Sequence, residues 1–375
     1  MRPSFTVAVD ARPLSHPQPG GFRSYVRALL HGLRDRQTAG ETTPRLLLYL
    51  DRPPSAELAA TLPPDAETRL LSPNRLRTDF RLFAAQVRAD RPDLVFGTQN
   101  YLPPALSAPT ALALHDALGI KRYPWADGTP RTLRERMIHG YWRWRTLASA
   151  RRARRIVSAS RGACMEIRSV LTGLPASRFA VVPIGIALPQ LPFGGERDAD
   201  TLLALASPDP RKNLALLYDA LAAFPARFGI TPRLRIVCTS ATVAARTTDT
   251  LAPFGIHAEL LTGLNDDALS VAFARAAVFV FPSRLEGFGL PPLEMMATGG
   301  AVAASDAAPM PEVLGDAPVY FSPDSAEGLA DGVGALLANP AERAERGERG
   351  RARAAAFTCR RMADETIAVW ESAVY

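Results

Sequence analysis

The chain has 375 residues, 47% of them apolar and 22% charged, which predicts a folded protein of about two domains and excludes a disordered or fibrous one. No apolar run approaches the roughly 18–20 residues that a membrane-spanning helix needs. The net charge is +7, but 42 of the 44 basic residues are arginines, a bias typical of a GC-rich genome, so basicity does not predict a nucleic-acid partner.

Cysteine usage predicts neither a metal centre nor a disulfide framework. Cys164, Cys238 and Cys359 are far apart, and the sequence has no Cys-x-x-Cys or Cys/His cluster. The chain reaches the carboxylate of Asp10 too early for its first residues to be a secretory signal. The expected location is therefore the reducing cytoplasm.

Short apolar runs alternate with longer amphipathic segments along the first half of the chain. The runs predict buried parallel strands, and the amphipathic segments predict helices between them. The strands are expected at residues 5–9, 45–50, 94–96, 110–114, 156–158 and 180–184, and the helices at 25–34 and 79–88. The alternation stops at residues 185–200, where glycines and prolines precede a charged stretch, so this segment is the predicted linker.

The alternation resumes after the linker and predicts a second domain of the same kind. Strands are expected at 202–206, 234–239, 258–261, 278–281 and 301–304, and helices at 213–224 and 266–276. The predicted fold class is α/β, with two Rossmann-like, doubly wound parallel sheets facing across a cleft. The expected boundaries are an N-terminal domain at 1–184, a C-terminal domain at 201–356, and a last helix at 357–375 that packs back toward the N-terminal domain.

The segment from Phe281 to Glu294 carries the densest chemical signal. It follows a predicted strand, contains Gly287 and Gly289, and has two prolines that suit the first turn of a helix. A strand, a glycine turn and a helix start favour phosphate, because free N–H groups and the helix dipole both attract an anion. Glu286 and Glu294 flank this site, where carboxylates are better acceptors for sugar hydroxyls than ligands for phosphate.

This segment resembles the Glu-x7-Glu motif of the retaining, GT-B-fold glycosyltransferases of family 4, the glycosyl transferases group 1 family. The resemblance continues over residues 295–300, 305–306, 311–313 and 315–317. It implies that Glu286 contacts the donor sugar and that Glu294 contacts the nucleotide ribose. The further donor contacts that it implies are Gly287, Phe288, Gly289 and Leu290.

A second motif, Pro-Arg-Lys-Asn, follows the strand predicted at 202–206. Lys212 is one of two lysines in the chain, and a lysine is a compact point charge suited to a diphosphate. The motif is similar to one of the same family, which implies that Lys212 neutralises the donor diphosphate. Many relatives have an Arg or Thr a few residues earlier, where this chain has Ala206 and Ser207. The hydroxyl of Ser207 remains there, and Arg211 is the candidate to compensate.

Two further strand ends in the N-terminal half resemble motifs of that family. Asp-Ala-Arg at residues 10–12 precedes Gly20 and Gly21, which the resemblance places against the donor phosphate or the acceptor. The usual Gly-x-Gly is not kept, because Arg23 stands at its second glycine. The pair His115-Asp116 ends another predicted strand, and the resemblance places His115 beside the anomeric carbon of the donor sugar. The acceptor-side residues implied are Asn100, Tyr101 and Asp116.

Residues 131–155 contain nine arginines and one glutamate, with Tyr141, Trp142 and Trp144 among them. Two interpretations stay open: a solvated helix face, or a helix that binds an anionic membrane and reaches a lipid-linked acceptor. Asp198-Ala199-Asp200 has the form of a DxD metal motif but lies in the predicted linker. We therefore expect no metal and no cofactor.

The resulting hypothesis is a retaining, metal-independent hexosyltransferase. It moves a mannose- or glucose-type unit from a nucleotide-diphosphate sugar to a hydroxyl of a glycan or lipid-linked acceptor, in cell-surface polysaccharide or lipopolysaccharide assembly. Lys212, Glu286 and His115 are the expected catalytic residues. The alternatives are a non-catalytic nucleotide-sugar-binding subunit of a glycan-assembly complex, or a GT-B sugar phosphorylase or epimerase. The expected place is the cytoplasm, at the inner face of the membrane if the basic helix binds lipid.

Overall fold

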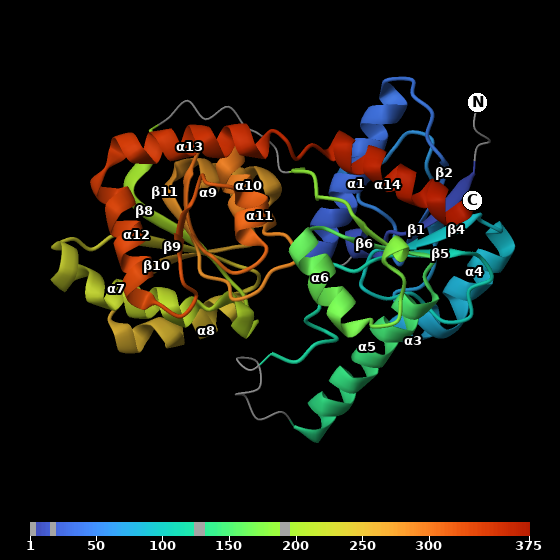
Figure 1. Ribbon diagram of the computed structural model, residues 1–375, viewed down its shortest axis with the longest axis horizontal. Coiled ribbons are helices and arrows are strands. Elements are labelled where there is room, and N and C mark those ends of the chain that lie inside the picture. Colours follow the sequence, from blue (N-terminus) through green and yellow to red (C-terminus); the bar gives the residue numbers. More distant parts are fainter. Residues whose placement is uncertain (1–4, 16–19, 124–131, 188–195) are drawn as a thin grey trace. The chain divides into compact units, whose positions relative to one another are not determined.

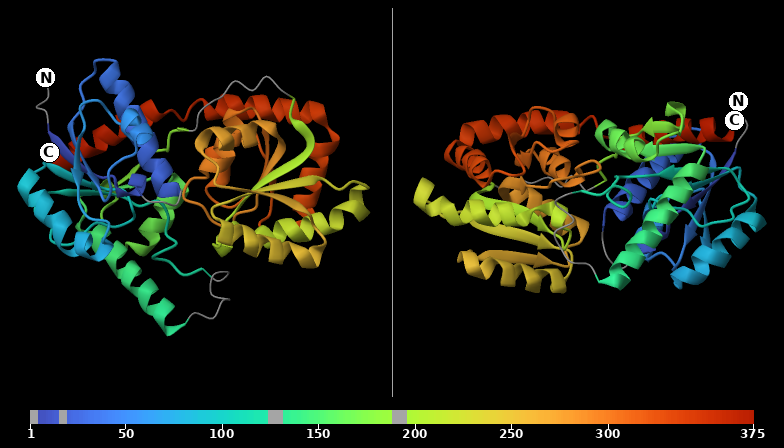
Figure 2. Two further views of the ribbon diagram at one scale, coloured as in Figure 1. Left: turned by 180° about the vertical axis from the view of Figure 1, so that it is seen from behind. Right: turned by 60° about the horizontal axis from the view of Figure 1, so that its bottom comes forward.

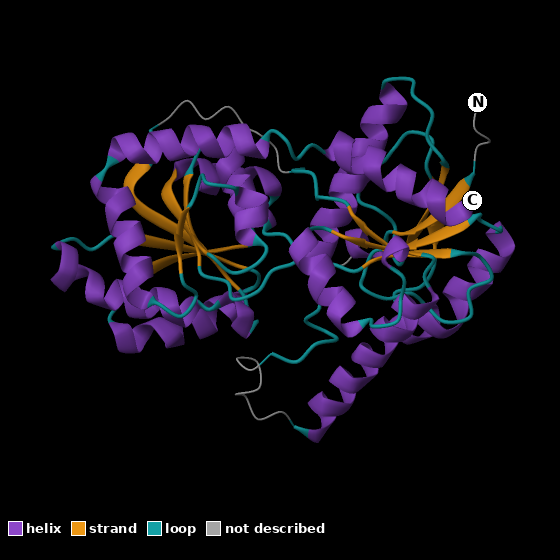
Figure 3. Cartoon of the chain, viewed as in Figure 1, coloured by secondary structure: helices purple, strands orange, loops and turns teal. Residues whose placement is uncertain are grey.

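The computed structural model describes residues 5–15, 20–123, 132–187 and 196–375. The chain divides into two compact units, Met1–Ala187 with Phe357–Tyr375 (unit 1) and Leu188–Ala356 (unit 2). Each unit is a parallel sheet with helices on both faces (Figures 1 and 3). The predicted fold class of two doubly wound parallel sheets is therefore confirmed.

The sheet of unit 1 has seven strands in the order β3-β2-β1-β4-β5-β6-β7, and all neighbours pair in parallel. Its strands are β1 (Thr6–Asp10), β2 (Arg45–Leu50), β3 (Glu67–Leu70), β4 (Leu94–Gly97), β5 (Thr110–Ala113), β6 (Arg155–Ser158) and β7 (Phe179–Val181). The sequence did not predict β3, because this edge strand has four residues that are only partly buried and contain no apolar run.

The helices of unit 1 begin where polar side chains can bond the free N–H groups of the first turn. Thr132 and Glu135 form a capping box at the start of α5, and Ser160 accepts the N–H of Ala163 at the start of α6. The helices are α1 (Gly21–Thr38), α2 (Ala56–Thr61), α3 (Arg75–Arg77), α4 (Phe83–Asp90), α5 (Leu133–Arg152), α6 (Arg161–Val170) and α14 (Cys359–Val374). A π-helical turn, η2 (Thr78–Leu82), joins α3 to α4.

The sheet of unit 2 has six parallel strands in the order β10-β9-β8-β11-β12-β13. They are β8 (Asp198–Ala206), β9 (Arg233–Cys238), β10 (Ala258–Thr262), β11 (Ala276–Phe281), β12 (Ala301–Ser305) and β13 (Val319–Phe321). The helices are α7 (Leu214–Phe228), α8 (Ala241–Leu251), α9 (Asp266–Arg275), α10 (Leu290–Ala297), α11 (Met310–Leu314), α12 (Ala326–Ala338) and α13 (Pro340–Ala354).

One predicted boundary is wrong. The linker was expected to run to residue 200, but β8 begins at Asp198 because arginines of unit 2 neutralise the acidic residues at its start. The central part of the predicted linker, residues 188–195, lies outside the described residues. In the part of the chain that the structure describes, no helix is both long enough and apolar enough to cross a membrane.

The last helix, α14, packs beside α1 within unit 1 (Figures 1 and 2). The contact is close at Gly32, where an added Cβ would lie 1.9 Å from the carbonyl oxygen of Cys359. The indole of Trp370 is fully buried and meets the ring of Phe96 in β4 at 5.3 Å. Residues more than 270 positions apart in sequence thus share one hydrophobic core.

We expect Trp370→Ala to destabilise unit 1 by about 3–5 kcal/mol, because it removes the largest fully buried side chain of the α14 contact. Denaturant unfolding followed by circular dichroism measures this change. Met165→Ala on α6, whose side chain is 69% exposed, is the matched control and should change stability little. Equal losses for the two variants would contradict this account of the core.

Candidate functional site

The candidate donor site of unit 2 lies at the carboxyl ends of β8 and β11. These two strands are neighbours in the sheet, and the strand order reverses between them. Such a switch point leaves a crevice in which open α/β sheets bind ligands. Lys212 comes from the loop after β8 and Glu286 from the loop after β11, so the fold brings together two predicted residues that are 74 positions apart.

Asn213 links these two loops through hydrogen bonds of its side chain. It adopts a left-handed backbone conformation (φ 54°, ψ 36°), and its Nδ2 donates to the carbonyls of Pro282 (3.1 Å) and Pro323 (2.8 Å). Its Oδ1 accepts from Nε of Arg284 at 3.2 Å. The backbone N–H of Arg284 also donates to the carbonyl of Arg211 at 2.8 Å. The loop that carries Lys212 is therefore fixed against the loop that carries Glu286.

Lys212 and Glu286 form a short, shielded ion pair. Nζ of Lys212 lies 2.7 Å from Oε1 of Glu286, and the two side chains are 16% and 9% exposed. Nζ also lies 5.1 Å from the centroid of the Phe281 ring. Burial alone would raise the pKa of Glu286, but the charges of Lys212 and Arg211 outweigh it and hold that pKa below its ordinary value. The carboxylate therefore stays ionised at neutral pH and accepts hydrogen bonds.

The two other polar residues predicted beside Lys212 lie in the same loop. Asp209 accepts the backbone N–H of Arg211 at 3.0 Å and its Nε at 2.8 Å. Nη1 of Arg211 lies 3.7 Å from Oε2 of Glu286. The hydroxyl of Ser207 accepts the N–H of Asp209 at 3.3 Å. Arg211 thus adds a second positive charge close to Glu286.

Few backbone N–H groups at the start of α10 are available to bind an anion. Gly289 has φ +91°, and an added Cβ would lie 2.5 Å from Cε of Met310, so glycine is required there. Pro291 and Pro292 have no N–H, so of the first four N–H groups of α10 only those of Gly289 and Leu290 remain as donors.

The remaining predicted residues of this segment surround that turn. Gly287 and Phe288 lie in the loop between Glu286 and Gly289, and Phe288 is buried. Glu294 lies on α10 and is buried as well. The structure therefore gathers the motif from Glu286 to Glu294 at the switch point of unit 2.

The DxD motif lies in the first strand of the unit 2 sheet, and its two carboxylates form ion pairs with arginines. Asp198 pairs with Arg235 at 2.9 Å and with Arg275 at 3.3 Å, and Asp200 pairs with Arg233 at 2.7 Å. Among the described residues no group of three or more His, Cys, Asp or Glu side chains has the arrangement of a metal site.

In unit 1, His115 follows β5 and is fixed on two sides. Its backbone N–H donates to Oδ1 of Asn100 at 2.9 Å, and its Nε2 lies 3.1 Å from the carbonyl of Thr98. Because a carbonyl only accepts, Nε2 carries the proton and Nδ1 is left as the acceptor. Burial lowers the pKa of His115, and the Thr98 carbonyl and Asp116 offset this only in part, so the ring is neutral at pH 7.

The three residues predicted on the acceptor side, near His115, make different contacts. Asn100 has a left-handed conformation (φ 64°) that places its amide at His115. Asp116 accepts the N–H of Leu118 at 2.9 Å. Tyr101 is 3% exposed, and its ring lies 5.2 Å from that of Trp142. The side chain of Tyr101 therefore belongs to the core of unit 1.

Gly20 and Gly21 lie at the start of α1, and the fold does not explain why they are glycines. Gly20 is extended (φ −175°), and neither residue has a positive φ. No described atom lies within 4 Å of a Cβ added at either position. The backbone at this helix start is thus open to an approaching molecule.

A buried network of four charges, which the sequence did not predict, lies behind the Asp-Ala-Arg motif. Arg12 donates to both carboxylate oxygens of Asp10 and to Oδ1 of Asp79, each at 2.7 Å. Arg145 of α5 donates to Oδ2 of Asp79 at 3.1 Å. All four side chains are at most 6% exposed. The π-helical turn η2 carries Asp79, and nothing in its local sequence indicated such a partner.

The arginines of residues 134–155 lie on α5 and just after it. Arg143, Arg152 and Arg154 are exposed, and each donates a hydrogen bond to a backbone carbonyl of unit 1. Arg145 is buried against Asp79, and Arg155, the first residue of β6, donates to the Ser372 hydroxyl. The exposed basic surface fits a solvated helix face and a membrane-binding helix equally.

The chain resembles known proteins in sequence and in fold. Residues 195–353 match the family described as glycosyl transferases group 1. This segment contains the Lys212–Glu286 pair and the start of α10. The C-terminal unit belongs to the glycosyl transferases group 1 family. This confirms the family that the motif from Glu286 to Glu294 resembles.

A relative that this chain is similar to is the MMP alpha-(1->4)-mannosyltransferase of Mycolicibacterium hassiacum. The two sequences are 32% identical over 201 residues, which are 52% of this chain and 48% of that protein. The chain thus spans about half the length of that relative.

Solved structures show that the GT-B fold extends over the whole chain. Sucrose-phosphate synthase from Thermosynechococcus elongatus matches 99% of this chain and 99% of its own, with a TM-score of 0.75 and 19% identity. Anabaena Alr3699/HepE, in complex with UDP-glucose, matches 98% of this chain and 99% of its own, with a TM-score of 0.71 and 16% identity. At these identities the likeness is one of fold.

We expect the Glu286 carboxylate to stabilise unit 2 at neutral pH and to lose this effect in acid. A carboxylate with a lowered pKa stabilises the fold above the pKa of the unfolded chain, about 4.3 for Glu, and the effect disappears as the pH falls through the folded-state pKa. Glu286→Gln should therefore lower the free energy of unfolding at pH 7 and make little difference in strong acid.

Denaturant unfolding of wild type and variant across this pH range measures the effect. Glu327→Gln is the control in the same unit, because Glu327 pairs with Arg227 but is 75% exposed. A difference between wild type and Glu286→Gln that persists unchanged below both pKa values would contradict the assignment.

Proposed function

We propose that this protein is a retaining glycosyltransferase that moves a mannose- or glucose-type unit from a nucleotide-diphosphate sugar to an acceptor hydroxyl. The observation that carries the proposal is the Lys212–Glu286 pair at the switch point of unit 2. A diphosphate needs a cation and N–H donors, and a sugar needs hydrogen-bond acceptors. Lys212 supplies the cation, Gly289 and Leu290 supply the N–H donors, and Glu286 supplies the acceptor for sugar hydroxyls.

The roles that we propose follow from charge and geometry. Lys212 has three donors on its ammonium group and uses one toward Glu286, so it can also hold the donor diphosphate. Glu286, ionised in a shielded site, accepts hydroxyls of the donor sugar. Glu294 on α10 binds the ribose, and Nδ1 of His115 accepts a hydroxyl of the donor sugar.

In the proposed reaction the acceptor oxygen forms a bond to the anomeric carbon while the bond from that carbon to the diphosphate oxygen breaks. The bonding electrons leave with the nucleoside diphosphate, and its departing phosphate takes the proton of the acceptor hydroxyl. Lys212 and the N–H groups before α10 stabilise the charge that grows on this leaving group. Attack from the same face retains the anomeric configuration.

The relatives support a hexose donor. The Mycolicibacterium protein is named a mannosyltransferase, and the Anabaena structure holds UDP-glucose. We propose a glycan or lipid-linked acceptor in the assembly of cell-surface polysaccharide or lipopolysaccharide.

Lys212→Ala should lower the transfer rate by about 10²-fold or more, because it removes the one lysine that can oppose the leaving charge. The measurement is the release of nucleoside diphosphate from UDP- and GDP-hexoses with acceptor present. Lys121→Ala is a matched control: it removes the chain's other lysine, which also pairs with a glutamate, Glu166, at 3.0 Å.

Transfer within a few-fold of wild type in Lys212→Ala would contradict the proposed role. Donor binding without any release of nucleotide would instead favour a non-catalytic binding subunit. Formation of a sugar 1-phosphate from a disaccharide and phosphate would favour a phosphorylase.

We further propose that residues 133–144 of α5 bind a membrane surface and bring the enzyme to a lipid-linked acceptor. Leu133, Met137 and Trp144 lie along one face of the helix and are 73%, 68% and 61% exposed. The exposed Arg134 and Arg136 lie beside them. Apolar and aromatic side chains with arginine suit the headgroup region of a bilayer.

The double variant Met137→Glu with Trp144→Glu should bind lipid vesicles several-fold more weakly, because it places charges on the apolar face. Sedimentation with vesicles, with and without anionic lipid, measures this binding. Met165→Glu on α6 is the control, since Met165 is as exposed but lies on another helix. Binding that the double variant leaves unchanged would show that α5 does not touch the membrane.

A further inference from the structure

Unit 1 has a cavity of about 280 Å³ at the carboxyl ends of its central strands. Arg12 follows β1, Asp51 follows β2 and Gln99 follows β4, and all three line the cavity. The strand order of unit 1 reverses between β1 and β4, so the cavity lies at the switch point of this sheet. Its size suits one sugar ring or a similarly small polar group.

The cavity adjoins His115. Phe22 lines the cavity, and its ring lies 5.3 Å from that of His115. Gln99 precedes Asn100, which accepts the backbone N–H of His115. A molecule in this cavity would therefore lie next to the residue to which we assign a contact with the donor sugar.

Arg75, the first residue of α3, also lines the cavity; it is exposed, and neutral partners position its guanidinium. Its Nε and Nη2 donate to the hydroxyl of Tyr101 at 3.2 and 2.8 Å. Its guanidinium stacks on the Trp142 ring at 4.6 Å and on the Tyr101 ring at 5.6 Å. Burial raises the pKa of Tyr101, so this hydroxyl stays neutral and does not balance the charge of Arg75.

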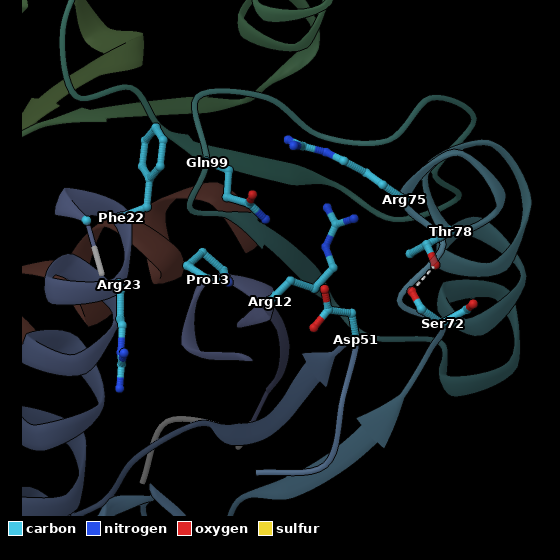
Figure 4. A pocket seen from close by; sticks show the side chains of 10 residues that line it. Arg12, Pro13, Phe22, Arg23, Asp51, Ser72, Arg75, Thr78 and Gln99 are labelled. Carbon is cyan, nitrogen blue, oxygen red and sulfur yellow. Dashed lines mark hydrogen bonds between the residues drawn. The ribbon is translucent and has the colours of Figure 1, made fainter. Parts of the chain in front are cut away.

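The other two guanidiniums near this point differ from Arg75, because each is paired with a carboxylate. Arg12 is bonded to Asp10 and Asp79, and Arg145 is bonded to Asp79. Within the described residues, Arg75 has no carboxylate within 4.0 Å. Figure 4 shows the side chains of Arg75, Arg12 and Gln99 pointing toward one open space. A guanidinium that neutral groups position at the wall of a cavity, without a carboxylate partner, is suited to an anionic ligand.

We propose that this cavity is the acceptor subsite and that Arg75 recognises an anionic group, a phosphate or a carboxylate, on the acceptor sugar. This inference rests on the proposed glycosyltransferase function. Nη1 of Arg75 and the second hydrogen on Nη2 supply donors for two anion oxygens. Asp51, whose Oδ1 has no hydrogen-bond partner among the described residues, accepts hydroxyls of the same sugar. The acceptor is thus a sugar phosphate or a sugar acid.

The test measures binding by calorimetry to the full chain with four probes: inorganic phosphate, mannose 6-phosphate, glucuronate and neutral methyl α-mannoside. We expect phosphate-bearing or carboxylate-bearing sugars to bind at least about 10-fold more tightly than the neutral glycoside, as charge-assisted hydrogen bonds add. The phosphate and carboxylate probes distinguish the two sources of the anion.

Arg75→Gln should remove this preference, and Arg75→Lys, which keeps the charge but not the planar fork, should restore part of it. Arg77→Gln, an exposed arginine of the same helix, is the control and should bind like wild type. Unchanged unfolding midpoints show that the variants fold.

Equal binding of neutral and acidic sugars, no binding of any anionic probe at millimolar concentration, or an unchanged preference in Arg75→Gln would overturn the inference. Failure of the proposed glycosyltransferase function would give a different binding result. In that case UDP and GDP do not bind, or do not depend on Lys212, while the acidic sugars still bind through Arg75.

Discussion

The ion pair between Lys212 and Glu286 is the interaction on which the candidate donor site depends. Two charged groups in a shielded crevice are stable only if each has a partner, and here each is the other's partner. The pair also keeps the glutamate ionised, with the pKa of Glu286 below its ordinary value despite burial. A diphosphate that binds Lys212 adds negative charge beside this pair, and Arg211 and the N–H groups of Gly289 and Leu290 are placed to balance it. The charges at this site thus match those that its proposed ligand requires.

Unit 1 holds its arginines in two ways within a short distance: Arg12 and Arg145 are buried, whereas Arg75 is exposed. Arg12 and Arg145 are neutralised by Asp10 and Asp79, and this network anchors the loop after β1 to η2 and to α5. Arg75 is instead contacted by the Tyr101 hydroxyl and the Trp142 ring, which position its guanidinium without supplying a negative charge. A buried arginine that is paired with carboxylates stabilises the fold, whereas an exposed arginine without a carboxylate partner among the described residues is available to an anionic ligand. The difference separates a structural network from the proposed acceptor subsite beside it.

The arginines of residues 134–155 do not all have the same surroundings. Arg145 is buried in the charge network, whereas Arg152 on α5 and Arg154 after it donate to backbone carbonyls of unit 1 and remain exposed. Leu133, Met137 and Trp144 are exposed on the same helix, beside the exposed Arg134 and Arg136. Membrane binding through this helix would therefore combine apolar insertion with electrostatic attraction, and only the electrostatic part would weaken with salt.

The sequence by itself determined the fold class, most strands and the family, because buried parallel strands appear as apolar runs and the motif from Glu286 to Glu294 is dense and local. It missed β3, which has no apolar run, and β13, which has only three residues, because edge strands this short give little sequence signal. Lys212, Glu286 and His115 were singled out from the chain one motif at a time. Only the tertiary structure decided that Lys212 pairs with Glu286, that Asp79 faces Arg12 and Arg145, and that Arg75 has no carboxylate partner among the described residues. Each of these facts depends on which side chains meet after the strands are ordered in the sheet, and hydrogen bonds and ion pairs act over a few ångströms that sequence spacing does not specify.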